Sequence, residues 1–127
     1  MKKLPETIAD VLANVTLDAD EKNLWNYQGT NPDMLAAQAV LQVGKMSRVI
    51  NGRELLHDEL KYEGWFRTVV DQSKPSGFGL SLDVVDSTGT DALAGARLQF
   101  LSEKYFRHAW KFFPELFERI LIKYKQQ

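Results

Sequence analysis

The sequence predicts a mainly α-helical fold, with five or six helices around a single core and one short extended segment or β-strand near residues 78–85. Three observations support this class. Apolar residues recur at helical spacing through most of the chain. Asn, Asp and Pro stand where those periodic stretches begin. An alternation of apolar and polar residues with a period of two is clear only over residues 78–85.

The totals describe an ordinary globular protein. A length of 127 residues fits one domain, which we assign to residues 1–127. The absence of cysteine excludes a disulfide framework, a thiolate metal site and a cysteine nucleophile. Pro5, Glu6 and Asp10 interrupt the first apolar residues, and no apolar run approaches the ~20 residues of a membrane span. We therefore expect a soluble, cytoplasmic protein that does not bind membranes.

The N-terminal quarter contains two predicted short helices. The first is expected over residues 5–15, because Ile8, Val11, Leu12 and Val15 follow helical spacing after a proline. The second is expected to begin at the acidic segment 18–21, which is suited to a helix N-terminus, and to end near Trp25.

A longer helix is predicted over residues 31–50. Asn31, Pro32 and Asp33 provide a capping side chain, a proline for the first position and an acid for the first turn. Asn51 and Gly52 end the helix, because both tolerate positive φ. Small residues along this helix allow another helix to approach closely; they are Ala36, Ala37, Ala39 and Gly44.

Residues 53–71 are predicted to form the next helix, because Leu56, Leu60, Phe66 and Val70 supply an apolar side. The tight connection to the previous helix predicts an antiparallel hairpin or a sharp corner. The strand at residues 78–85 follows a turn. Its pairing partner is left open and could be residues 15–17, residues 25–27 or the same strand of a second copy. In the remaining alternative it is an extended segment that lies on helices and is not paired.

The C-terminal third carries most of the aromatic residues. We predict one long helix from Asp91 to about Phe112, and a further helix that begins at Pro114, where proline is tolerated. A broad apolar arc on the long helix contains Leu98, Leu101, Tyr105, Phe106, Ala109, Trp110, Phe112 and Phe113. Its opposite face is basic, and we place Phe100 and Leu93 among those charges.

No metal or catalytic pattern in the sequence is complete. Glu54 and His57 have the spacing of carboxylate-bridged metal centres in helical bundles, but the second such pair is missing. Residues 83–91 lack the order and the final Glu of a calcium loop. The glycines of residues 76–79 precede a strand rather than a helix, which is unsuited to phosphate. We therefore predict no metal site, no cofactor and no catalytic residues.

The basic face of the long helix is the predicted partner-binding surface. Residues 1–90 carry nine Lys/Arg and thirteen Asp/Glu, a net −4, whereas residues 91–127 carry seven and four, a net +3. Such asymmetry fits a surface that meets a polyanion, and it fits equally one end of the chain that docks on the acidic end of a second copy. The candidate partner-binding residues are Arg97, Phe100, Lys104, Arg107, His108, Trp110 and Lys111.

These observations favour a non-catalytic protein-binding or adaptor protein, such as an inhibitor, an immunity factor or an accessory factor of a mobile element. We expect self-association as a two-fold dimer, because the wide apolar arc and an unpaired strand both need covering. One alternative is an accessory protein that binds nucleic acid through the basic face, although a sequence pI of 6.1 is low for that role. Another is a small-ligand-binding protein or enzyme with a pocket between helices, near His57 or Tyr62.

Overall fold

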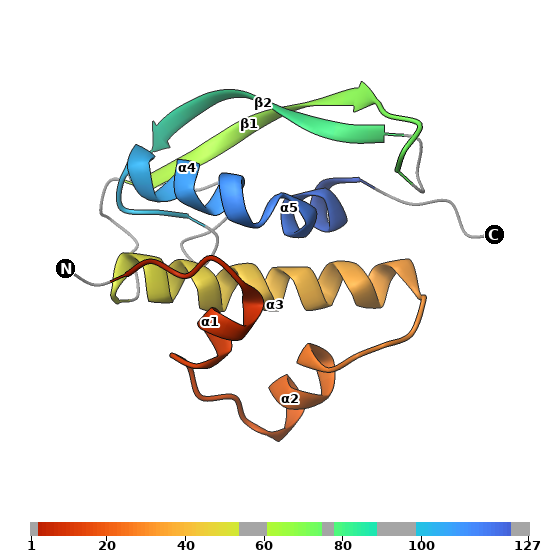
Figure 1. The fold of residues 1–127 in the computed structure, drawn as a ribbon, viewed down its shortest axis with the longest axis vertical. Coiled ribbons are helices and arrows are strands. Elements are labelled where there is room, and N and C mark those ends of the chain that lie inside the picture. The colour runs from red at the N-terminus through yellow and green to blue at the C-terminus, as the bar shows by residue number, and fades with distance from the viewer. Residues whose placement is uncertain (1–2, 54–60, 75–77, 89–98, 123–127) are drawn as a thin grey trace.

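The computed structural model describes residues 3–53, 61–74, 78–88 and 99–122. Within these ranges the protein is mainly α-helical and has a two-stranded antiparallel sheet. In chain order the elements are α1 (Ile8–Leu12), α2 (Ala19–Trp25), α3 (Pro32–Asn51), β1 (Lys61–Val70), β2 (Phe78–Thr88), α4 (Glu103–Phe112) and α5 (Pro114–Leu121). They are stacked in layers: the sheet, then α4 and α5, then α3, then α1 and α2 (Figure 1).

Both N-terminal helices begin with reciprocal side-chain caps. Thr7 and Asp10 form a capping box at α1, and Asp18 and Glu21 form one at α2. The start of α2 is as predicted, whereas α1 is shorter than residues 5–15. A hydrogen bond from the Lys45 ammonium, 2.6 Å from Glu21, lowers the pKa of that carboxyl and joins α2 to α3.

The prediction for α3 is confirmed at both ends. The Asn31 side chain accepts hydrogen bonds from the backbone N–H groups of Asp33 and Met34. Gly52 ends the helix with φ of 80°, a conformation that favours glycine. Gln38, on the buried side of α3, donates to the carbonyls of Leu24, Trp25 and Tyr27, and so satisfies the open C-terminal end of α2.

The predicted helix over residues 53–71 is wrong where the structure describes it, because residues 61–70 form β1. Residues 54–60 lie outside the described ranges. The strand contains aromatic and β-branched residues that suit a pleated surface, among them Tyr62, Thr68 and Val69. Gly64 lies against α4, where an added Cβ would overlap the ring of Phe106.

Strand β2 is confirmed and runs beyond residue 85 to Thr88. It pairs with β1 in antiparallel register, from Lys61 opposite Thr88 to Val70 opposite Phe78, with an irregularity after Trp65. The suggested pairing with residues 15–17 or 25–27 is therefore wrong. The described segments cover one face of this hairpin with α4 and α5 and leave the other face open (Figure 1).

The prediction of one continuous helix from Asp91 to about Phe112 is also wrong. Residues 91–98 lie outside the described ranges, residues 99–102 are not helical, and α4 begins at Glu103 after the Ser102 cap. The backbone of Phe100 instead pairs with Tyr62 of β1, through hydrogen bonds of 2.8 and 3.0 Å. The predicted break is confirmed, since Phe113 ends α4 and Pro114 is the first residue of α5.

The apolar arc of α4 is covered on two sides within the chain. Phe106 is 1% exposed, and its ring centroid lies 5.7–6.0 Å from those of Phe66, Phe100 and Phe117. Ala109 and Phe113 are also buried, and α3 packs against both α4 and α5 on the side opposite the sheet. The width of this arc thus reflects its position between two layers.

Candidate functional site

The structure divides the predicted partner-binding residues between the surface and the core. Lys104, Arg107 and Lys111 are exposed on α4, on the face opposite Ala109 and Phe113. Arg97 lies outside the described ranges. The placement of Phe100 among surface charges is wrong: its side chain is 0% exposed, because the segment that carries it pairs with β1 and turns the ring toward Phe106.

The half-buried members of the set already have partners. The His108 Nε2 lies 2.7 Å from the carbonyl oxygen of Pro5, so this ring holds the N-terminal segment against α4. The Trp110 ring packs on Phe66 at 4.9 Å, which places it against the sheet rather than on an open stacking surface. These two side chains therefore contribute to packing.

The exposed cations differ in their electrostatic surroundings. Arg107 forms an ion pair with Glu103 at 2.9 Å, one helical turn away. Lys111 lies 5.2 Å above the ring of Phe112. Within the described part of the chain, Lys104 and Lys111 have no carboxylate partner, and they stand two helical turns apart, about 10 Å. The surface that remains for an anionic partner is this pair of lysines.

The other sequence motifs do not form sites in the described ranges. Glu54 and His57 lie outside them, as do residues 76–77 of the glycine-rich segment and the end of residues 83–91. Residues 83–88 belong to β2, where Asp83 is paired with Arg67 at 3.0 Å. Among the residues that the structure describes, no three His, Asp or Glu side chains gather closely enough to hold a metal ion.

The outer edge of β2 is a second candidate surface. The sheet contains two strands, and β1 occupies one edge of β2. In the ranges described, no segment pairs with the other edge of this 11-residue strand. Every second residue of an antiparallel edge strand directs its N–H and C=O outward, which makes such an edge a template for another strand.

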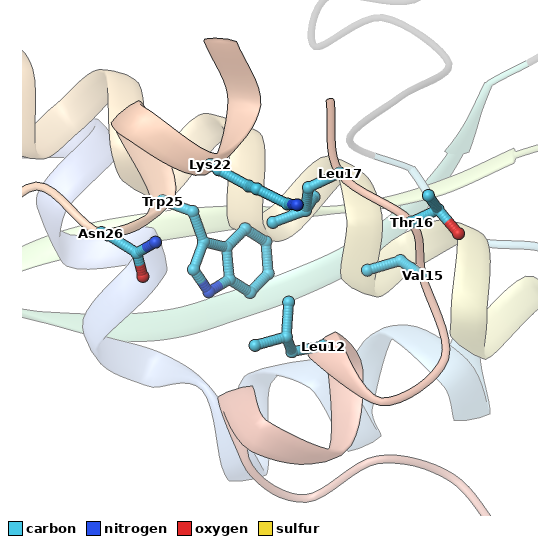
Figure 2. Close-up of a pocket in the computed structure, with 7 residues that line it drawn as sticks. All are labelled: Leu12, Val15, Thr16, Leu17, Lys22, Trp25 and Asn26. Carbon is cyan, nitrogen blue, oxygen red and sulfur yellow. The ribbon is translucent and has the colours of Figure 1, made fainter. Parts of the chain in front are cut away.

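A third candidate is a depression of about 350 Å³ at the opposite end of the molecule, between α1, the following loop and α2 (Figure 2). Its lining residues are Leu12, Val15, Thr16, Leu17, Lys22, Trp25 and Asn26. The pocket expected from the sequence, near His57 or Tyr62, is elsewhere in the chain. Tyr62 lies in β1, far along the chain from the depression, and His57 is outside the described ranges.

Comparisons with protein-family models, curated proteins and solved structures gave no match. None of the helices in the described ranges has both the length and the apolar content needed to cross a membrane. The surfaces themselves must therefore support any functional assignment.

Proposed function

We propose that this protein is non-catalytic and acts by binding another protein, through strand addition along the outer edge of β2. The outer edge of β2 supports the proposal, because the strand is 11 residues long, its other edge is already paired with β1, and no described segment pairs with this one. Strand addition supplies main-chain hydrogen bonds that need no specific side chain on the partner. An exposed strand edge of this length is otherwise a risk for aggregation.

A second copy of this chain is the proposed occupant of the edge. Two β2 strands related by a two-fold axis run antiparallel and offer each other the same row of donors and acceptors. The ion pair between Arg67 and Asp83 neutralises charge on the open face of the sheet, and the net charge of the chain is only −1. Electrostatic repulsion between two copies is therefore small.

This proposal changes the grounds for a dimer. From the sequence, self-association was expected because a lone strand and the apolar arc of the long helix both needed covering. Strand β1 now supplies one partner for β2, and the sheet and α3 cover the arc of α4. The reason that remains to expect a dimer is the second edge of β2, with which no described segment pairs.

Light scattering should give a mass of twice the 14.5 kDa chain at tens of micromolar. Ser81→Lys, at an exposed position of β2, should shift the mass toward the monomer, because the two-fold axis brings two like charges together. Val69→Lys, at an exposed position of β1 on the same face of the sheet as Ser81, is the matched control and should leave the dimer largely intact. A 14.5 kDa particle for the unmodified protein would contradict the proposal, as would equal dissociation of the two variants.

The alternative, an anionic partner at α4, is supported by Lys104 and Lys111, which have no carboxylate partner among the described residues. Their joint replacement by Glu should change the free energy of unfolding by no more than about 0.5 kcal/mol per site. If the partner is nucleic acid, affinity should fall for all sequences and its salt dependence should weaken by about one unit of slope per lost phosphate contact. If it is an acidic protein, the association rate should fall instead. Gel-shift and stopped-flow titrations at several salt concentrations distinguish these outcomes, and unchanged binding would remove α4 as the site.

A further inference from the structure

The depression between α1 and α2 has an apolar wall and floor. Leu12, at the end of α1, is 43% exposed and faces the depression. Its aliphatic side chain is in contact with water there, so an apolar ligand that covers it would be stabilised. Trp25 and Leu17 form the floor and are 6% and 8% exposed. A volume of about 350 Å³ lies within the range of small-molecule sites, about 300–1,000 Å³.

The polar groups of the depression include two donors without partners. Within the described part of the chain, the indole N–H of the nine-tenths-buried Trp25 has no hydrogen-bond acceptor. The indole nitrogen lies on the side of the ring that faces Leu12 (Figure 2). The Lys22 side chain extends from α2 toward the loop that carries Leu17, and no carboxylate of the described residues pairs with it.

The charge of the lining has one sign. Lys22 is its only charged residue, and none of the seven lining residues is Asp or Glu. Glu21, the neighbouring carboxylate on α2, is engaged by Lys45 at 2.6 Å. A ligand with an acceptor or an anionic group thus meets a cation and an N–H donor beside an apolar wall.

The geometry points to a binding site for a small amphiphilic carboxylate, with an unbranched apolar chain against Leu12, Val15 and the Trp25 ring. The carboxylate accepts the indole N–H of Trp25. The exposed Lys22 side chain, whose ammonium lies beside Leu17 on the other side of the ring (Figure 2), turns toward the carboxylate to pair with it. The site is separate from the proposed function, because α3, α4 and α5 lie between it and the sheet (Figure 1). Failure of one proposal therefore leaves the other intact.

Titration of the ¹⁵N-labelled protein with hexanoate, hexanol and hexylammonium tests this site by NMR. Hexanoate should shift the Trp25 indole resonance and the amide resonances of Leu12 and Val15, with saturation. Its affinity should exceed that of hexanol by about threefold, the effect of one exposed ion pair, and hexylammonium should bind most weakly.

Variants separate the two polar contacts. Lys22→Met should bring the affinity for hexanoate down to that for hexanol, because it keeps the length of the side chain and removes the charge. Trp25→Phe removes the N–H and should weaken both oxygen-bearing probes. Val40→Ala, at an exposed apolar residue on α3, is the matched control and should change neither affinity.

Three outcomes would overturn the assignment. One is the absence of saturable shifts at Trp25 and Leu12 when hexanoate is added to the unmodified protein. Another is equal affinity for hexanoate and hexylammonium. The third is tighter binding of a short acidic peptide, acetyl-Leu-Asp-amide, than of hexanoate. That result would assign the depression to a protein partner.

Discussion

Replacing Phe106 with alanine should lower the free energy of unfolding by about 3–5 kcal/mol. The ring is 1% exposed and contacts three other aromatic rings, from β1, from the segment before α4 and from α5. Its removal leaves a cavity at the point where these segments meet, and the surrounding structure closes such a cavity only in part. Urea unfolding followed by circular dichroism measures the loss.

Gly64 provides an internal check on this contact. A Cβ at Gly64 would lie 2.8 Å from Phe106 Cε1 and 3.0 Å from Leu82 Cδ1, so Gly64→Ala alone should cost about 1–3 kcal/mol. In the double variant Gly64→Ala with Phe106→Ala, the new methyl group enters the cavity, and the combined loss should be smaller than the sum. Strictly additive losses would show that Phe106 does not pack on Gly64.

Asn51→Ala should lower the free energy of unfolding by about 2–4 kcal/mol, because it removes two hydrogen bonds to the backbone of the segment before α4. The Asn51 amide donates to the carbonyl of Gln99 at 3.1 Å, and its oxygen accepts the N–H of Leu101 at 2.9 Å. These bonds fix the segment that pairs with β1 against the end of α3. Hydrogen exchange of Phe100 and Tyr62 should accelerate in the variant.

Asn31→Ala is the matched control for this prediction. It makes the same substitution in the same helix, but at an exposed N-terminal cap, where the loss is about 1 kcal/mol. The two substitutions thus compare a cap within one helix with a link between distant segments. If Asn51→Ala proved no more destabilising than Asn31→Ala, the link between α3 and residues 99–101 would not be a major source of stability.

The composition and periodicity of the sequence were sufficient to predict the exposed part of the α4 surface. Lys104, Arg107 and Lys111 recur at helical spacing and are exposed in the structure. The error at Phe100 arose because the predicted helix was continued through residues 99–102. The depression could not be predicted, since Leu12 and Trp25 come together only through the packing of α1 and α2.

The sequence by itself determined where α2 and α3 begin, where α3 ends and where α5 begins. The caps at Asp18 and Asn31, the glycine at Gly52 and the proline at Pro114 act within one turn of their own positions, so they need no distant partner. Only the tertiary structure decided that residues 61–70 form a strand and that Phe100 is buried. Strand β1 satisfies its backbone through β2 and Phe100, and these partners lie well beyond the reach of any local signal.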